Sequence, residues 1–240
     1  MLVVNGLNVA YGYLQVVWDI SFHVDKSEII AILGLNGAGK TTALKSIAGL
    51  IPPKSGCIML SGQSITGLPA NEVVRRGLVF IPEESNLFAG MSVYENLVLG
   101  AYILKDKNAI KTNLDYVYSL FPSLSDRKRQ LVGTMSGGER QMVAIARGLM
   151  SNPQLVMFDE PSMGLSPKNV GIVLGAIATL REQKVTVVIV EQNVAAALES
   201  SDRAYVMEQG RIVMEGASSE LLHNDHVQKR YLGMEDPYSS

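Results

Sequence analysis

Ile29-Ile30-Ala31-Ile32-Leu33 followed by Gly34-Leu35-Asn36-Gly37-Ala38-Gly39-Lys40-Thr41 is the stretch that decides the fold of this 240-residue chain. Five apolar residues with no polar alternation are typical of a strand that is buried on both faces of a parallel sheet. The next eight residues fit the phosphate-binding pattern G-x-x-x-x-G-K-[ST], and a helix is expected from Lys40 to Ala48. Strand, glycine-rich loop and helix in this order predict a P-loop core that binds a nucleotide.

The residue types in this loop suit a nucleoside triphosphate. Glycines let the backbone wrap around phosphates and aim amide groups at them, and the helix that follows adds its positive N-terminal dipole. Lys40 should reach the β- and γ-phosphates, Thr41 offers a hydroxyl ligand to Mg²⁺, and Thr42 can contact the α-phosphate. We therefore expect the ATP site to contain Gly34, Leu35, Asn36, Gly37, Ala38, Gly39, Lys40, Thr41 and Thr42.

A second strand, Leu155–Phe158, runs directly into two acids, Asp159 and Glu160. Carboxyl ends of parallel strands are where such sheets place their ligands. Asp159 fits the Walker B role of holding Mg²⁺, usually through water. Glu160 is placed to accept a proton from the water that attacks the γ-phosphate.

The remaining patterns outline the rest of the fold. Thr186–Val190 is another unalternating apolar run, whereas Trp18, Ile20, Phe22 and Val24 alternate with polar residues and predict a half-buried antiparallel strand. Ala204–Glu208 and Arg211–Glu215 flank Gln209-Gly210 as a hairpin. The expected class is α/β: a P-loop NTPase core with a mainly parallel sheet, an N-terminal antiparallel β subdomain and an inserted α-helical subdomain.

We expect one domain over residues 1–240, with the core at about 1–83 and 153–240 and the helical subdomain at about 84–152. Within that insertion, Ser92 and Glu95 have the spacing of a capping box. Leu114, Val117, Tyr118 and Phe121 share one face of a further helix.

Composition narrows the function classes. A net charge of −2 gives little general attraction for nucleic acid, so no nucleic-acid partner is expected. No apolar run approaches the ~18 residues of a membrane span, and the first twelve residues lack the features of a secretory signal, which predicts a soluble cytoplasmic chain. The one cysteine, Cys57, lies in the apolar run Cys57–Leu60 and is expected to be a small buried residue.

A third motif is Thr134-Met135-Ser136-Gly137-Gly138-Glu139, followed by Met142, Ile145, Ala146 and Leu149 at helical spacing. Ser136 and Glu139 form a second predicted capping box. Taken alone, the motif fits an ordinary capped core helix as well as it fits an anion site. Because the chain already has a P-loop for its own nucleotide, a second anion-binding site would bind a partner's nucleotide.

Together these motifs resemble the ATP-binding cassette family, whose order of P-loop, signature L-S-G-G-Q, Walker B and switch residue spans Gly34 to Gln192 here. In that family two cassettes pack head to tail, and each ATP lies between one P-loop and the other signature. The resemblance implies that Ser136 and Gly138 contact a partner's ATP and that Gln192 is the switch residue. It also implies that Tyr11 stacks on adenine, although a core tyrosine is an alternative reading.

Four positions depart from the family pattern. The signature has Met135 and Glu139 at its ends, a mild change because Glu139 supports the helix cap. Glu83 stands where a glutamine is expected; it remains an oxygen ligand for Mg²⁺ but adds negative charge near the γ-phosphate. Ser166 replaces an aspartate, which puts aspartate-dependent communication between sites in doubt. Gln192 replaces a histidine, so its expected role is positional.

Within the family, three segments look like the ATPases of branched-chain amino-acid importers, closest to the second ATP-binding subunit: Glu191-Gln192-Asn193, Pro161–Pro167 and Arg230-Tyr231-Leu232-Gly233. The resemblance implies a second cassette, homologous or identical, two transmembrane permease subunits and, indirectly, an external substrate-binding protein. The chain would then sit on the cytoplasmic face of the cell membrane.

Two other classes of protein are alternatives. A soluble cassette protein acting on ribosomes or DNA would usually carry two cassettes or a long coiled-coil insertion. A P-loop kinase or small GTPase would lack the Ser-Gly-Gly helix start.

Overall fold

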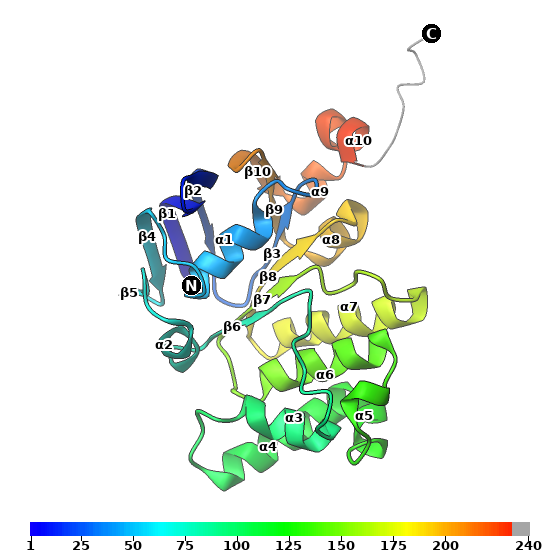
Figure 1. The fold of residues 1–240 in the computed structure, drawn as a ribbon. Coiled ribbons are helices and arrows are strands. Elements are labelled where there is room, and N and C mark those ends of the chain that lie inside the picture. The colour runs from blue at the N-terminus through cyan, green and yellow to red at the C-terminus, as the bar shows by residue number, and fades with distance from the viewer. Residues whose placement is uncertain (232–240) are drawn as a thin grey trace.

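Two β-sheets organise residues 1–231, the part of the chain that this computed structural model describes (Figure 1). The central sheet has six strands in the order β10-β9-β3-β8-β7-β6, and all neighbours are parallel except β10, which pairs antiparallel with β9. Its strands are β3 (Ile29–Leu33), β6 (Leu78–Ile81), β7 (Leu155–Asp159), β8 (Thr186–Glu191), β9 (Arg203–Glu208) and β10 (Arg211–Ala217). The expected α/β class is confirmed, and so are the predicted buried strands and the hairpin.

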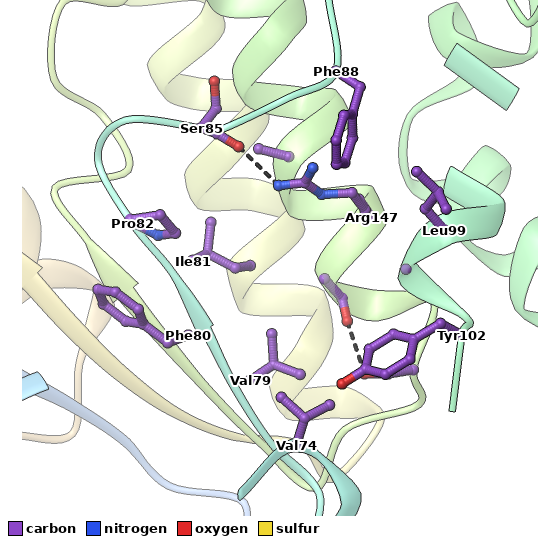
Figure 2. A pocket seen from close by; sticks show the side chains of 14 residues that line it. Val74, Val79, Phe80, Ile81, Pro82, Ser85, Phe88, Leu99, Tyr102 and Arg147 are labelled. Atoms are coloured by element: carbon purple, nitrogen blue, oxygen red, sulfur yellow. Dashed lines mark hydrogen bonds between the residues drawn. The ribbon is translucent and has the colours of Figure 1, made fainter. Parts of the chain in front are cut away.

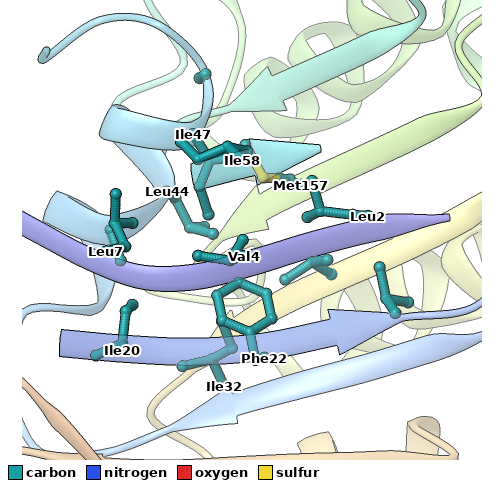
Figure 3. Packing of buried hydrophobic residues seen from close by; sticks show 14 of the residues in the cluster. Leu2, Val4, Leu7, Ile20, Phe22, Ile32, Leu44, Ile47, Ile58 and Met157 are labelled. Atoms are coloured by element: carbon teal, nitrogen blue, oxygen red, sulfur yellow. The ribbon is translucent and has the colours of Figure 1, made fainter. Parts of the chain in front are cut away.

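The second sheet is antiparallel, with the order β2-β1-β4-β5. It contains β1 (Leu2–Tyr11), β2 (Leu14–Val24), β4 (Ser55–Leu60) and β5 (Gln63–Ser64). Helix α1 (Lys40–Ile47) lies between the two sheets, and Figure 3 shows Leu44 and Ile47 packed among Val4, Phe22 and Met157. This cluster joins the antiparallel sheet to one face of the central sheet.

Strand β7 illustrates why the central strands do not alternate in polarity. Leu155 and Met157 belong to the cluster beside α1, whereas Val156 and Phe158 belong to a second cluster on the opposite face. Because both faces are covered, every side chain of the strand is buried. A third, smaller cluster lies between β3, β9 and the C-terminal helices.

The second cluster is formed largely by helices that follow β6 and precede β7 in the chain (Figure 1). They are α3 (Val93–Gly100), α4 (Lys107–Leu120), α5 (Pro122–Asp126), the 3₁₀ turn η1 (Val132–Thr134) and α6 (Gly137–Leu149). Both predicted capping boxes, at Ser92 and at Ser136, are present. The division into a core and a helical subdomain over residues 84–152 stays a prediction.

The remaining helices cover other parts of the central sheet. They are α2 (Ala70–Arg75), α7 (Pro167–Glu182), α8 (Val194–Ser200), α9 (Ser218–Leu221) and α10 (Asp225–Tyr231). None of the helices within residues 1–231 combines the length and apolar character needed to cross a membrane. Of the tail residues used in the family comparison, Leu232 and Gly233 lie outside the described residues.

Two predictions about burial were wrong. Trp18 is exposed rather than on the buried face of β2, because Asp19 adopts a positive φ of 50° and the pairing with β1 is irregular there. Val17 takes the buried position instead. Cys57 is also exposed, since only Ile58 and Leu60 of β4 are buried and Cys57 lies on the other face of the strand.

Candidate functional site

Adjacent parallel strands bring the predicted site residues to one edge of the central sheet. Leu33, the last residue of β3, pairs with Glu191 of β8, and Asp159 of β7 pairs with Val190. The loop after β3, the two acids at the end of β7 and the residue after β8 therefore meet beside α1. This is the carboxyl edge at which the sequence placed them.

The phosphate-binding loop joins β3 to α1. Gly39 is the N-cap of α1 with a φ of 99°, a left-handed conformation that favours glycine. Lys40 is 4% exposed, and its Nζ donates to the carbonyl oxygens of Gly34 at 2.7 Å and Leu35 at 3.2 Å. Burial lowers the pKa of Lys40, and the nearby carboxylates of Glu160 and Asp159 oppose that effect.

Asp159 and Thr41 are in direct contact, since the Thr41 hydroxyl donates to Asp159 Oδ1 at 2.9 Å. Burial raises the pKa of Asp159, the hydrogen bond from Thr41 lowers it, and the charge of Glu83 raises it. The Thr41 hydroxyl thus bonds to one carboxylate, that of Asp159, and the charge of a second carboxylate, Glu83, is close enough to affect it.

Glu160 is 8% exposed and lies close to both a cation and an amide. Its Oε1 is 3.9 Å from Lys40 Nζ, and its Oε2 accepts a hydrogen bond from Gln192 Nε2 at 2.7 Å. Burial raises the pKa of Glu160, with Glu83 and Asp159 adding to the rise and Lys40 and Gln192 opposing it. The backbone of Glu160 has a positive φ of 49°, a strained conformation of the kind found at functional sites.

An open cavity of about 400 Å³ lies over the phosphate-binding loop. Its lining contains most of the predicted ATP, metal and catalytic residues: Asn36, Gly37, Ala38, Gly39, Lys40, Thr41, Thr42, Glu83, Glu160 and Gln192. Gly34 and Leu35 adjoin it through their carbonyl contacts with Lys40. Tyr11 is exposed at the end of β1 and lies outside this lining, and its stacking on adenine stays a prediction.

Sequence reasoning missed two residues that line this cavity, Val16 of β2 and Met163. Met163 lies in the segment after Walker B and is exposed. Sequence reasoning gave Glu191 no role of its own. The residue is buried and accepts a hydrogen bond from the amide of Ser162 at 3.0 Å. Its position directly after an apolar run, like that of Asp159, was the available signal.

The signature residues lie outside the cavity lining, at the start of α6. The Ser136 hydroxyl donates to Glu139 Oε2 at 2.9 Å, and the same carboxylate accepts from the Ser136 amide. A Cβ at Gly138 would collide with the side-chain amide of Asn169 on α7. Any larger residue at this position would have to displace the Asn169 side chain, so helix packing also favours glycine here.

A second cavity, of about 250 Å³, lies between β6, α3 and α6 (Figure 2). Its walls include Phe80, Phe88, Leu99 and Tyr102, and Phe88 is 54% exposed. The Arg147 guanidinium enters this cavity and donates to the carbonyl oxygens of Ser85 and Asn86, both at 2.9 Å. Arg147 thus ties α6 to the loop that follows Glu83.

Comparison with known proteins identifies the family of this chain. The model of the family described as "ABC transporter" matches residues 17–163, which include the P-loop, the signature and Walker B. This chain belongs to the ABC transporter family. One relative is the high-affinity branched-chain amino acid transport ATP-binding protein BraG of Pseudomonas aeruginosa. Its sequence is 43% identical to this one, over 97% of this chain and 100% of the length of the relative.

Other relatives of the ABC chain lie at lower identity. The probable branched-chain amino acid transport ATP-binding protein LivF of Archaeoglobus fulgidus is 40% identical, covering 96% of this chain and 98% of that protein. The lipopolysaccharide export system ATP-binding protein LptB of Escherichia coli is 36% identical over 97% of both.

Solved structures share the fold. The ADP conformation of MJ1267, an ATP-binding cassette of an ABC transporter, has a TM-score of 0.86 at 25% identity and covers 98% of this chain and 99% of its own. The structure of an ATP-binding subunit of an ABC transporter has a TM-score of 0.84 at 27% identity. The match covers 97% of this chain and 96% of that subunit. The chain is thus an ABC ATPase cassette.

Proposed function

We propose that this ABC cassette hydrolyses ATP to power uptake of branched-chain amino acids through separate membrane subunits. The single observation that carries the ATPase part is that Lys40 and Glu160 line one cavity beside the phosphate-binding loop, 3.9 Å apart, while Asp159 bonds to Thr41 of the same lining. The substrate class is supported by the two relatives at 43% and 40% identity, whose names specify branched-chain amino acid transport. The relative named for lipopolysaccharide export is less similar, at 36%.

In this proposal the loop amides and the N-terminus of α1 hold the phosphates, and Lys40 exchanges its two backbone carbonyl partners for phosphate oxygens. Glu160 accepts the proton of the attacking water as the new bond to the γ-phosphorus forms and the bond to the β,γ-bridging oxygen breaks. Gln192 cannot take up a proton, but its amide orients Glu160 through the 2.7 Å hydrogen bond.

Mg²⁺ fits the oxygen donors present. The Thr41 hydroxyl and the Asp159 carboxylate lie 2.9 Å apart, and Glu83 lines the same cavity. Hard cations of this size prefer such oxygen ligands and complete their shell with water and phosphate. The ion would neutralise charge on the β- and γ-phosphates. It would also offset burial and, after burial, the carboxylate repulsion that raise the pKa of Asp159 and Glu160.

The partners follow the family's way of working. We propose a second cassette, homologous or identical, whose bound ATP is contacted by Ser136 and Gly138 of this chain. Two permease subunits and an external substrate-binding protein complete the set of partners. The chain would then lie on the cytoplasmic face of the membrane. The core would comprise about residues 1–83 and 153–240, and the helical subdomain about residues 84–152 would contact the permeases.

The second cavity supports that last assignment. Its exposed aromatic walls form an unpartnered apolar surface next to the loop that follows Glu83, so a segment seated there could sense changes at the ATP site (Figure 2). Arg147 faces the same cavity, and no carboxylate within residues 1–231 lies within ion-pair distance of it. An acidic residue on a permease segment would suit it.

Uptake in the native organism tests the substrate. Deletion of this chain should abolish the uptake of labelled leucine, isoleucine and valine. Wild-type protein should restore it and the Glu160→Gln variant should not. Copurification of membrane subunits with the tagged chain separates transport from the rival role on ribosomes or DNA. Unchanged uptake of all three amino acids after deletion would refute the proposed substrate class.

A further inference from the structure

The C-terminal helix α10 is anchored on one carboxylate, that of Glu208 at the end of β9. The Tyr231 hydroxyl donates to Glu208 Oε1 at 2.7 Å, Arg230 Nε lies 3.1 Å from the same atom, and His226 Nε2 lies 3.3 Å from it. Burial and this contact with Glu208 raise the pKa of Tyr231 to about 12, so the hydroxyl keeps its proton as a donor. Three side chains of α10 thus converge on a single oxygen.

Glu208 is the last residue of β9 and directly precedes the Gln209-Gly210 turn, which packs against the phosphate-binding loop. The Gly210 amide, two residues further on, donates to the carbonyl oxygen of Ala38 at 2.9 Å. A Cβ at Gly34 would collide with the carbonyl oxygen of Met207, and one at Gly39 would lie 3.0 Å from the Met207 side chain. The segment Met207–Gly210 therefore packs against both ends of the loop, through backbone at Gly34 and through the Met207 side chain at Gly39.

The loop also borders a second space. Residues 36–38 line both the ATP cavity and a smaller open cavity of about 190 Å³, whose lining includes Arg230 and Tyr231. Displacement of α10 would remove these two walls and free the turn beside the loop.

We propose that α10 braces the phosphate-binding loop through Glu208, which makes Tyr231 and Arg230 positioning residues for ATP binding. A loop that is already held in its binding conformation loses less conformational freedom when ATP arrives. The brace therefore strengthens binding without touching the reacting atoms. This inference rests on the proposed role of the loop.

ATP affinity tests the brace directly. In the Glu160→Gln background, which is intended to prevent hydrolysis, Tyr231→Phe should weaken ATP binding about three- to tenfold, in line with the loss of one hydrogen bond to a charged group. Glu208→Gln should weaken it at least as much, because a neutral amide oxygen accepts all three contacts more weakly. The double variant should match the larger single effect, since both changes break the same link.

The matched control is Tyr116→Phe, which removes a buried tyrosine hydroxyl that has no hydrogen-bond partner. It should leave the ATP affinity within about twofold. With active Glu160, Tyr231→Phe should raise the KM for ATP and leave kcat unchanged. Amide exchange at residues 36–39 should accelerate in Tyr231→Phe and not in the control.

Two results would overturn the brace. One is wild-type ATP affinity in Tyr231→Phe, and the other is a lowered Tm in that variant with affinity unchanged in the folded protein, which would make α10 a stabilising helix only. A wild-type chain that fails to bind ATP would instead refute the proposed function, so the two failures are distinguishable.

Discussion

At the scale of single residues, each group assigned to ATP hydrolysis has a hydrogen-bond partner within the protein. Lys40 bonds to loop carbonyls, Thr41 bonds to Asp159, and Gln192 bonds to Glu160. In our proposal Mg-ATP replaces the contacts of Lys40 and Thr41, whereas the bond from Gln192 to Glu160 persists and orients the base. The sequence predicted that these residues meet, because motif spacing fixes the strand ends. It could not predict the Gln192 to Glu160 bond, which depends on side-chain rotamers.

The pH dependence of hydrolysis should report on this bond. Glu160 works as a base only when it is ionised, so activity should fall as pH drops through its raised pKa, at a higher pH than for an ordinary carboxyl group. Gln192→Ala removes a contact that lowers this pKa, so the acid limb should move further up in pH and the rate should fall about tenfold or more.

Gln192→His should lose less activity than Gln192→Ala, since a histidine ring still supplies a donor. Steady-state hydrolysis measured across pH 6 to 9 checks both variants. An alanine variant as active as wild type at every pH would leave Gln192 with no role beyond preceding α8, whose N-cap is Asn193.

At the scale of elements, α6 connects the two surfaces assigned to partners. Its first turn carries Ser136 and Gly138, and Arg147 near its other end holds the loop after Glu83. The capping box was predictable because Ser136 and Glu139 interact locally. The contact of Gly138 with Asn169 was not, because α7 approaches from a distant part of the sequence.

Pairing of two cassettes should depend on Ser136. In the Glu160→Gln background, Ser136→Arg should block ATP-induced dimerisation in light scattering, because a bulky cation would occupy the space of a partner's phosphates. Binding of ATP by the monomer should persist. Ser92→Arg is the matched control, since it removes the same kind of helix cap from α3, at a cost of about 1 kcal/mol. An intact ATP-induced dimer in the Ser136→Arg protein would refute the composite site.

Contact with the permeases should depend on the exposed aromatic residues of the second cavity. Phe88→Ala should reduce transport in reconstituted vesicles several-fold while ATP hydrolysis by the isolated cassette stays near wild type, because Phe88 lines no part of the ATP cavity. Val213→Ala, which shortens an exposed apolar side chain on β10, should change neither activity. Equal losses of transport and isolated hydrolysis in Phe88→Ala would count against a coupling surface at this cavity.

At the scale of the whole molecule, the order of buried strands and glycine-rich turns was enough to predict an α/β P-loop fold with an antiparallel N-terminal sheet. Apolar runs without polar alternation, such as Ile29–Leu33, indicate a strand that is buried on both faces of a sheet. Burial at irregular positions was less predictable: Trp18 and Cys57 are exposed because a distortion in β2 and the register of β4 turn them away from the core. The brace from α10 could not be predicted either, since it joins residues about 190 positions apart.

The central claim is that one carboxylate, Glu160, makes this cassette an ATPase. We would measure phosphate release and ATP binding by the purified chain and by Glu160→Gln, with Glu199→Gln as a matched control because Glu199 is an exposed glutamate on α8. The account predicts that Glu160→Gln binds ATP as tightly as wild type and releases phosphate at least about a hundredfold more slowly, as for loss of a general base, while the control matches wild type in both. Phosphate release by Glu160→Gln at the wild-type rate would contradict it.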